Sequence, residues 1–442
     1  MPARTTLHGA VRRIFHRSPT IEAAALGVLD AWCQFALLPF RRARRQGHVA
    51  EDAALVIATD RYNRAAEQYF ATIDDPSFLL GKPFSEPAAL PKHLIDAGIL
   101  LSALRVAPGD VVMEVGAGSC WLSHILNRYG CRTIAVDVSS TALALGRQLF
   151  ETDPRTNWQL RPEFLCYDGH HLPAADTSCD GIVINDAFHH VPNQRELLTE
   201  MHRVLRPHGI VAMSEPGRGH GATAQSIREA ADSGVLENEL VLENVAALAG
   251  DCGFGSVEVV LASPFAHMAI NAGELGPFMG GKGFAHYWKS YCAALEQHHY
   301  ITCAKTAGGH TTRRPSRLSA QIVVESGSVL SVRAGEPIII QLMITNTGDT
   351  TWLCGDTPRS GWTRVGAHLY RENDTRALVD FDWWRQALPR DVSPGQTATL
   401  VAELPPLLTA GTYVMTIDLV IERVAWFADF GCEPATLRIT VL

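Results

Sequence analysis

The sequence predicts an α/β region built on a largely parallel sheet, followed by an all-β region. Between residues 111 and 214, short apolar runs alternate with stretches of helical periodicity, as in strands joined by crossover helices. Beyond residue 318, short alternating runs are separated by turn residues, as in an antiparallel sandwich. The chain has 442 residues, 47% hydrophobic and 19% charged, which is enough for two or three folded domains.

Apolar runs predict the strands of the α/β region, and segments with a 3.6-residue period predict its helices. We expect residues 60–104 to be mostly helical as well. The strands are expected at 111–115, 132–136, 162–166, 181–185, 209–214, 256–261 and 300–304, and helices at 119–129, 140–151 and 194–206.

A glycine turn follows the first of these strands. Gly116 and Gly118 let the backbone turn sharply and let a ligand approach closely, and Ser119 begins a helix whose first amides are free. Asp137 closes the second strand, 19 residues beyond Gly118, where a carboxylate can accept hydrogen bonds from two ribose hydroxyls. This spacing indicates a site for a nucleotide cofactor.

The residues around the turn favour a cationic cofactor over a dinucleotide. The fingerprint G-x-G-x-x-G needs its third glycine for close packing of helix on strand, and Trp121 occupies that position. Glu114 lies two residues before Gly116, where negative charge suits ammonium and sulfonium groups better than a diphosphate. A nicotinamide-dependent oxidoreductase is therefore the least favoured interpretation.

Segments spread over about residues 90 to 310 resemble class I S-adenosylmethionine-dependent methyltransferases. Glu114–Cys120 is similar to the E-x-G-x-G-x-G motif, with Cys120 in place of the third glycine. Tyr167–Pro192 resembles the small-molecule branch of the family, in which an Asp contacts the adenine amine and a His-Val pair follows strand four. Glu200–Val211 resembles the E-x-x-R-V-L-x-P-G-G turn into strand five, with His208 replacing the first glycine.

The resemblance implies a Rossmann-like seven-stranded sheet with an antiparallel final strand, and S-adenosyl-L-methionine as the cofactor. Gly116 and Gly118 would line its methionyl part, and Glu114 would hold the methionyl amine through water or shape the loop. Asp137 would bind the ribose hydroxyls, Asp168 the adenine amine, and Asn185 would border the methionyl end. The implied cofactor-binding residues are Glu114, Gly116, Ala117, Gly118, Asp137, Val138, Asp168, Gly169 and Asn185.

Methyl transfer depends mainly on alignment and a desolvated pocket, and it needs a base only where the acceptor must lose a proton. His189 and His190, just beyond strand four, are the predicted catalytic residues, with Asp186 as the alternative base. In the competing interpretation, one histidine orients the loop and the other packs in the fold.

The paired histidines also raise the question of a metal site. His170, His171, His189 and His190, with Asp186, follow strands that end at the same edge of the sheet, so in principle they can gather around an ion. Adjacent histidines point in different directions, however, and the family that the chain resembles commonly has polar or His residues there without metal. We therefore predict no metal site.

Acceptor recognition is expected in two segments that carry no recognisable motif, 60–104 and 262–298. Within the second, Phe278–Trp288 combines glycines with aromatic residues, which suits a substrate lid. A loop followed by a surface helix over 285–297 is an equally good interpretation. The sequence does not indicate whether O, N or C is methylated.

The first 50 residues carry eight arginines against Glu22 and Asp30, although the net charge of the chain is −8. The rest of the chain is therefore acidic, and no nucleic-acid partner is expected. No signal peptide is expected, because Met1–Pro19 is polar and basic. The apolar stretch Ile21–Phe40 is interrupted by charges, so no transmembrane span is expected. This stretch and the following cluster Arg41–Arg45 have two interpretations: a helix that contacts the membrane surface through residues 1–48, or a helix packed on the domain.

Ten cysteines without a C-x-x-C pair favour a reducing compartment. The expected location is therefore cytoplasmic, with the inner face of the membrane as the alternative.

The all-β region resembles immunoglobulin-like modules appended to bacterial enzymes of surface-polysaccharide synthesis, through Asn346–Trp352, Pro405–Tyr413 and Asp418–Phe427. Trp352 and Trp426 are expected in its core. Trp383 and Trp384 are consecutive, so one of them should face outward, where an indole can stack on a sugar. Glycan binding, or a docking or homo-oligomer contact through the sandwich, is the expected role of this region.

The sequence thus predicts an N-terminal helical segment (1–89), a methyltransferase domain (90–312) and an immunoglobulin-like β-sandwich (318–442). The expected activity is methyl transfer to a small-molecule or glycan-type acceptor, in surface-polysaccharide biosynthesis if the sandwich presents the acceptor. The alternative is a non-catalytic scaffold that binds the cofactor and recognises a glycan or protein through the sandwich.

Overall fold

The computed structural model describes residues 52–442 apart from 307–309, 314, 356–359 and 373–376, and it describes side chains from residue 59. The predicted interfacial helix over 21–40, the Arg41–Arg45 cluster and the membrane contact through 1–48 therefore lie outside the described residues. None of the helices that the structure describes combines the length and the apolar character that a membrane crossing requires.

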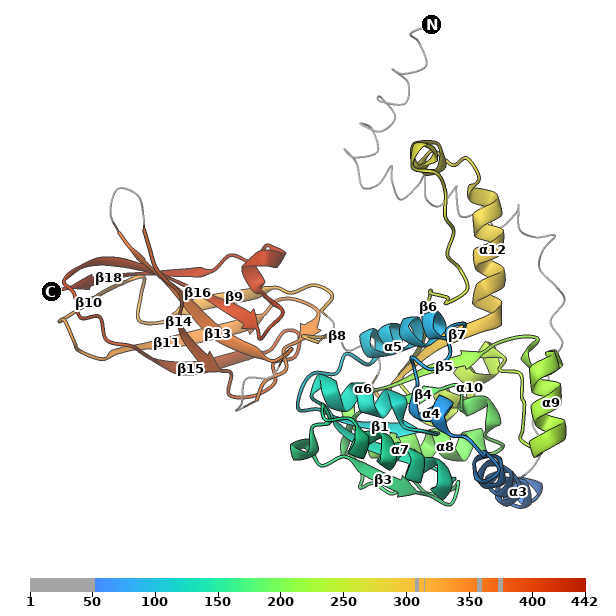
Figure 1. Ribbon diagram of the computed structural model, residues 1–442. Coiled ribbons are helices and arrows are strands. Elements are labelled where there is room, and N and C mark those ends of the chain that lie inside the picture. Colours follow the sequence, from blue (N-terminus) through green and yellow to red (C-terminus); the bar gives the residue numbers. More distant parts are fainter. Residues whose placement is uncertain (1–51, 307–309, 314, 356–359, 373–376) are drawn as a thin grey trace, which may run out of the picture. The chain divides into compact units, whose positions relative to one another are not determined.

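A seven-stranded sheet organises the first half of the described chain (Figure 1). Its strands lie in the order β3-β2-β1-β4-β5-β7-β6, and all pairs are parallel except those that β7 forms with β5 and β6. This is the predicted Rossmann-like methyltransferase sheet with an antiparallel final strand, so the fold class is confirmed. The strands are β1 (Val111–Val115), β2 (Arg132–Asp137), β3 (Glu163–Cys166), β4 (Cys179–Asn185), β5 (Leu205–Pro216), β6 (Ser256–Val260) and β7 (His298–Ala304).

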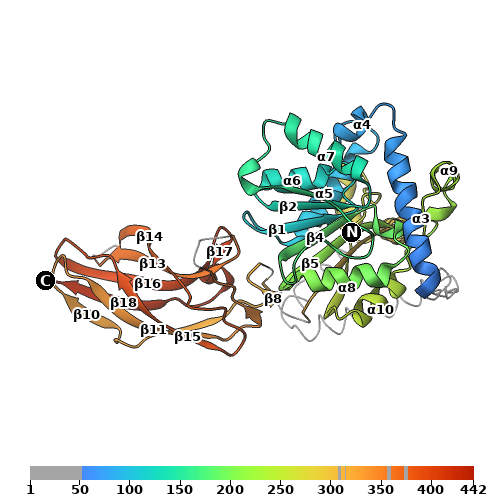
Figure 2. The ribbon, with the colours of Figure 1, turned by 90° about the horizontal axis from the view of Figure 1, so that it is seen from below.

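Helices cover both faces of this sheet, which explains why its strands are apolar without alternation (Figure 2). Val112 packs with one group of helices, whereas Met113, the next residue, packs with the other group. The first group is α5 (Leu90–Leu104), α6 (Trp121–Tyr129) and α7 (Ser140–Thr152); the second is α8 (Gln194–Val204) and α10 (Leu242–Asp251).

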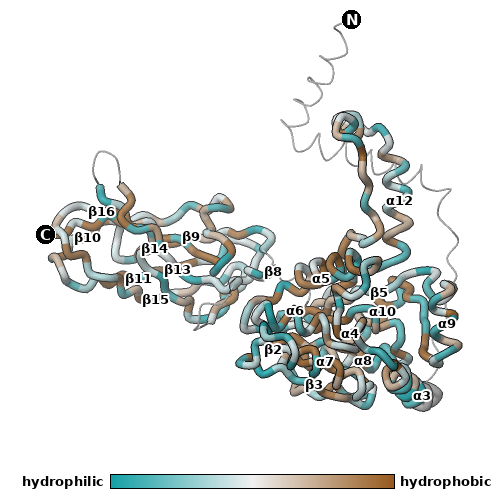
Figure 3. Tube along the Cα trace, viewed as in Figure 1, coloured by the Kyte–Doolittle hydropathy of each residue, from teal (hydrophilic) through white to brown (hydrophobic). Residues whose placement is uncertain are grey.

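The predicted helices over 60–104 are present as α3 (Asp52–Ala71), α4 (Ser77–Leu80) and α5. Figure 3 shows that α5 is mainly hydrophobic and α3 mainly hydrophilic. This difference matches their places, since α5 packs on the sheet whereas most of the described side chains of α3 are exposed or half-buried.

The insertion between β6 and β7 contains α11 (Leu275–Met279) and α12 (Phe284–Gln297), which runs away from the sheet (Figures 1 and 3). The surface helix of the second interpretation is therefore present. Its C-terminal half is held to the chain after β6, because the hydroxyl of Tyr291 donates to the carbonyl of Leu261 over 2.8 Å. A lid movement of this segment stays a prediction.

The C-terminal region consists of strands in several sheets, with one hydrophobic core shared by β11 (Ile338–Asn346) of a three-stranded sheet and β13 (Thr363–Arg371) of a six-stranded sheet. Its other strands are β8 (His310–Thr311), β9 (Ala320–Val324), β10 (Val329–Val332), β12 (Thr350–Thr351), β14 (Ala377–Ala387), β15 (Thr397–Leu404), β16 (Gly411–Ile421), β17 (Ala425–Trp426) and β18 (Ala435–Val441). The C-terminal region is therefore all-β, as predicted, and two of its sheets share this core.

The tryptophans of this region follow the prediction only in part. Trp352 is fully buried in the shared core, as expected. Trp426 is not a core residue: its ring lies over Gly366 and beside His368, on the face of β13 opposite to the core residues Val365 and Ala367. The expectation for Trp426 was wrong because strand β17 places it against the outer face of the sheet.

Candidate functional site

The glycine turn after β1 has a geometry that only glycine tolerates. Gly116 and Gly118 both have positive φ, 69° and 51°. A Cβ atom on Gly116 would lie 2.4 Å from the Cβ atom of Ala187, in the loop after β4. The absence of a side chain at Gly116 therefore brings the loops after β1 and β4 together at the carboxyl edge of the sheet.

Asp137, at the end of β2, holds this turn through its backbone amides. Its Oδ2 accepts a hydrogen bond from the Gly118 amide over 2.8 Å, and its Oδ1 accepts one from the Ser139 amide over 2.9 Å. Burial raises the pKa of Asp137, although these amides act in the opposite direction. Each oxygen keeps a second lone pair, so the predicted contact with ribose hydroxyls is compatible with this geometry and remains a prediction.

Glu114 is buried beneath the turn, and its Oε2 accepts a hydrogen bond from the Ser123 amide in the first turn of α6 over 2.8 Å. Burial raises the pKa of this carboxyl to about 7. Of the two predicted roles, the geometry supports shaping the loop rather than reaching the methionyl amine. With this raised pKa, Glu114 does not present a fixed negative charge to a cofactor at neutral pH.

The loop after β3 provides the residues predicted to bind adenine. Asp168 accepts hydrogen bonds on Oδ1 from the amides of His170 (2.7 Å) and His171 (2.8 Å), and its side chain is 59% exposed. Gly169 has a φ of 85°, and a Cβ atom there would lie 2.7 Å from Nδ2 of Asn63. Of the other predicted cofactor residues, Ala117 is buried in the turn and Val138 follows Asp137.

Helix α3 crosses the same edge of the sheet and contacts three of its loops (Figure 2). Asn63 donates to the carbonyl of Asp168 over 2.7 Å, and Glu67 accepts from the hydroxyl of Ser139 over 2.8 Å. The ring of Phe70 lies 3.7 Å from where Gly118 would carry a Cβ atom. These three residues were missed from the sequence because polar residues on a helix outside any motif give no signal of what they contact.

A second group of polar side chains lies at the end of β4. Lys92 of α5 places Nζ 2.8 Å from Oδ2 of Asp96 and 2.8 Å from Oδ2 of Asp186. The hydroxyl of Tyr300 donates to Oδ1 of Asp96 over 2.5 Å, and Nε2 of His298 lies 3.7 Å from the same oxygen. We call these five residues the polar cluster. Apart from Asp186, they were missed from the sequence, because α5 and β7 meet only in the folded chain.

The polar cluster determines the pKa of Asp186 and therefore its suitability as a general base. Burial would raise the pKa of Asp186, but the ammonium group of Lys92 outweighs this effect and holds the pKa below its usual value. A carboxylate held in this way is a poor general base. The neighbouring Asn185 has a buried Oδ1 without a hydrogen-bond partner among the described residues, which leaves an acceptor for a ligand.

The two predicted catalytic histidines have different environments. His189 is buried, and its Nδ1 lies 2.7 Å from Oε2 of Glu215, whose carboxylate also accepts from the amides of Ala187 and Phe188. Burial alone would lower the pKa of His189, but Glu215 raises it. His190 is half-buried, its Nδ1 donates to the carbonyl of Leu236 over 2.5 Å, and burial lowers its pKa. Neutral His190 therefore presents Nε2 as a basic nitrogen.

The four histidines considered for a metal site are not brought together. His170 pairs with Glu196 at 2.9 Å, and the ring of His171 lies 3.6 Å from Asp168. The rings of His189 and His190 have centroids 3.8 Å apart and are tilted by 42°, and they belong to a different set of contacts.

The third motif of the sequence proves to be structural. Arg203 binds Glu200 over 2.7 Å and donates to the carbonyls of Leu172 and Ala174, while Glu200 accepts from the amide of Leu172. Glu200 and Arg203 of this motif therefore anchor α8 to the chain before β4 by hydrogen bonds.

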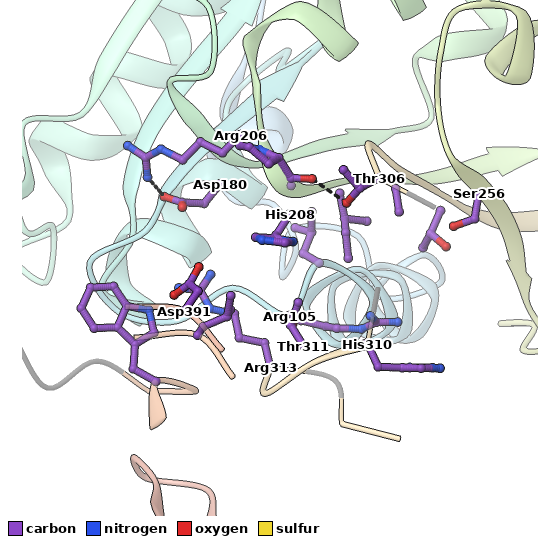
Figure 4. Close-up of a pocket in the computed structure, with 18 of the residues that line it drawn as sticks. Arg105, Asp180, Arg206, His208, Ser256, Thr306, His310, Thr311, Arg313 and Asp391 are labelled. Carbon is purple, nitrogen blue, oxygen red and sulfur yellow. Dashed lines mark hydrogen bonds and ion pairs between the residues drawn. The ribbon is translucent and has the colours of Figure 1, made fainter. Parts of the chain in front are cut away.

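A pocket of about 470 Å³ lies at the opposite, amino-terminal edge of the strands. It is lined by Asp180 at the start of β4, by Arg206 and His208 in the first part of β5, and by Ser256 at the start of β6. Figure 4 shows the ion pair between Asp180 and Arg206, at 2.6 Å, beside this pocket. Because the glycine turn lies at the carboxyl edge, this pocket is separate from the candidate cofactor site.

Comparison with known proteins agrees with the fold and the turn. Residues 113–213 match the family model described as "Methyltransferase domain". The match begins in β1 and ends in β5, so it includes the glycine turn, Asp137 and the loop after β4. Over these residues the chain is therefore similar to methyltransferase domains.

Curated relatives match the same region. Phosphoethanolamine N-methyltransferase 2 of Caenorhabditis elegans is 25% identical over 203 residues, which are 45% of this chain and 44% of that protein. Demethylmenaquinone methyltransferase of Clavibacter sepedonicus is 32% identical over 112 residues, 25% of this chain and 43% of that protein. The chain thus spans about half the length of the curated relatives it matches.

Among solved structures, Haemonchus contortus phosphoethanolamine N-methyltransferase 2, in complex with phosphomonomethylethanolamine and S-adenosylhomocysteine, is 19% identical. The likeness covers 56% of this chain and 60% of that one, with a TM-score of 0.37.

Proposed function

We propose that this protein transfers the methyl group of S-adenosyl-L-methionine to a small-molecule acceptor. One observation carries the proposal: at the carboxyl edge of the sheet, the amide of Gly118 in the glycine turn donates a hydrogen bond to Asp137. Both residues lie in the segment that matches the methyltransferase family model. The acceptors named for the relatives differ, one being phosphoethanolamine and another demethylmenaquinone, so they support the class of acceptor and no single compound.

When bound, S-adenosylmethionine supplies a sulfonium-activated methyl group. The residues of the chain would orient it: Asp137 through the ribose, Asp168 through the adenine amine, and the glycine turn along the methionyl part. Helix α3 would keep water from the cofactor, since Asn63 and Phe70 contact the loops on which these groups lie. Asn185 would bind a donor of the ligand through its free Oδ1.

Among the three predicted bases, His190 has the most suitable state for taking a proton from an acceptor. Its pKa is lowered and its Nδ1 is fixed by Leu236, whereas His189 is held by Glu215 and Asp186 by Lys92. We expect His190→Gln to lower kcat about 10²-fold or more for a hydroxyl acceptor, with S-adenosylmethionine affinity unchanged. An unchanged kcat would show that another group takes the proton.

Two measurements test the proposed function. Asp137→Ala should weaken S-adenosylmethionine binding by about 1 to 3 kcal/mol in calorimetry, because it removes hydrogen bonds to the ribose. Transfer of a tritiated methyl group should then be assayed against small-molecule and glycan fractions. Cofactor binding without any labelled product would favour the scaffold, in which the cofactor is held without turnover.

A glycan-type acceptor is the finer form of the proposal, and it rests on the interpretation of the C-terminal region as an immunoglobulin-like module. Both Trp383 and Trp384 are half-buried against the sandwich core, and Trp384 also lines a shallow pocket with Ile339 and Glu403. An indole beside a carboxylate suits a sugar face and its hydroxyls. We expect Trp384→Ala to abolish retention on immobilised bacterial polysaccharide, with Phe430→Ala, an exposed aromatic outside this pocket, as the control.

A further inference from the structure

Two histidines and a glutamate meet beyond the carboxyl ends of β4 and β5. They are His189 in the short helix after β4, His220 in the short helix after β5, and Glu237 in the segment before α10. Nε2 of His220 lies 2.8 Å from Oε2 of Glu237, and Nε2 of His189 lies 3.9 Å from the same oxygen. One ligand atom from each residue lies within 4.8 Å of the other two. We call these residues the histidine cluster.

Glu215 fixes the orientation of His189 within this cluster. Its Oε2 lies 2.7 Å from Nδ1 of His189, so Nδ1 carries the proton and donates it to the carboxylate. The lone pair of Nε2 then points away from Glu215 and toward Glu237. A carboxylate behind an imidazole is the usual support for a metal-binding histidine, because it sets the tautomer and raises the basicity of the other nitrogen.

Glu237 is the residue that a structural role alone does not explain. Its side chain is 5% exposed, and among the described residues only histidine rings approach its carboxylate: Nε2 of His220 lies 2.8 Å from Oε2, and Nδ1 of His190 lies 3.5 Å from Oε1. A buried carboxylate in this state is costly unless a cation compensates it. The titratable groups that face Glu237 are His189, His190 and His220, and a second carboxylate, Glu215, contacts His189 on the other side of its ring.

We propose that Nε2 of His189, Nε2 of His220 and the carboxylate of Glu237 bind a divalent first-row transition metal ion such as Zn²⁺. Two imidazoles and one carboxylate are a donor set that Zn²⁺ and Fe²⁺ accept, with positions left open for water or a ligand oxygen. The hydroxyl of Ser226, 3.3 Å from Nε2 of His220, is the other polar neighbour of that ligand atom. The ion compensates the negative charges of Glu215 and Glu237, and it links the segment after β4 to the segment after β5.

This proposal differs from the four-histidine site considered from the sequence. Only His189 is common to both sets, and neither His220 nor Glu237 lies in a motif. It is also independent of the proposed function, because metal binding is measured without cofactor or acceptor.

The test is metal binding by the full chain. After treatment with a chelator, the protein should take up one equivalent of Zn²⁺ in competition with a fluorescent zinc indicator, and Co²⁺ should give the visible bands of a protein-bound ion. Glu237→Gln, which keeps the shape of the side chain, and His220→Ala, at a site 27% exposed, should each remove this equivalent. Glu215→Gln should weaken binding about 10- to 100-fold.

His286→Ala is the matched control, because His286 is exposed on α12 and lies outside the histidine cluster. It should bind Zn²⁺ as the unchanged protein does. Circular dichroism should show that each variant is folded. The proposal would be overturned if the unchanged protein bound no stoichiometric Zn²⁺. It would also be overturned if the folded variants His220→Ala and Glu237→Gln bound Zn²⁺ as tightly as the unchanged protein does, since protonated histidines would then compensate the glutamates.

Discussion

The two halves of the carboxyl edge of the sheet are built differently. On the cofactor half, the glycine turn is held within one stretch of chain, where Asp137 accepts a hydrogen bond from the amide of Gly118 and Glu114 accepts one from that of Ser123. On the other half, Lys92 reaches Asp186 across 94 residues, and Tyr300 reaches Asp96 across 204. A site formed from neighbouring residues leaves a motif in the sequence, whereas a site assembled from distant elements does not.

The largest expected effect tests the distant half. Lys92→Met leaves Asp96 and Asp186 without their cation, and Asp96 is fully buried, so we expect a loss of about 3 to 5 kcal/mol in unfolding free energy. Urea denaturation measures it. Adding Asp96→Asn should restore a large part of the loss, because Asn can still accept from Tyr300. No recovery in the double variant would mean that Lys92 acts through packing and not through charge.

The glycine turn provides the next largest effect. Gly116→Ala places a Cβ atom 2.4 Å from that of Ala187, and we expect a loss of about 3 kcal/mol together with loss of S-adenosylmethionine binding. Gly234→Ala is a matched control, since Gly234 has the same φ of 69° but no neighbour within 4 Å of the added atom. It should cost only about 1 kcal/mol, the effect of the backbone conformation alone. Equal losses in the two variants would refute the role given to close packing.

The pH dependence of stability tests the state of Glu114. Its pKa is raised to about 7 in the folded chain, so the folded protein binds a proton more tightly than the unfolded chain does. The stability that this protonation provides is complete below about pH 4.5 and is lost as the pH rises through 7. Glu114→Gln should therefore be more stable than the unchanged protein at pH 8, by about 2 to 3 kcal/mol, and similar at pH 4.5. Thermal or urea unfolding at both pH values measures this, and a pH-independent difference would contradict it.

The smallest effect concerns the helix over the cofactor half. Asn63→Ala removes one hydrogen bond to the carbonyl of Asp168, and we expect S-adenosylmethionine binding to weaken by about 1 kcal/mol. Arg61→Ala, on the same helix but at an exposed position, should leave the affinity unchanged in calorimetry. If both variants bind equally well, α3 does not order the adenine loop.

The strands could be predicted because each is an apolar run covered on both faces, as at Val112 and Met113. The starts of β5 and β7 differ from the prediction. Strand β5 begins at Leu205, which pairs with Cys179, and β7 begins at His298, which pairs with Pro216; both starts are earlier than expected, because polar residues such as His299 continue the pairing. Trp426 was misplaced for a related reason, since a two-residue strand has too little pattern to show which face it covers.

By itself the sequence determined the order of strands and helices, the glycine turn and the class of cofactor, because each depends on residues that are neighbours along the chain. Only the tertiary structure decided that Glu114 supports a helix, that Lys92 neutralises Asp186, and that His189, His220 and Glu237 meet. The physical reason is that charge compensation and burial depend on which distant side chains share a volume, and a linear pattern does not contain that information.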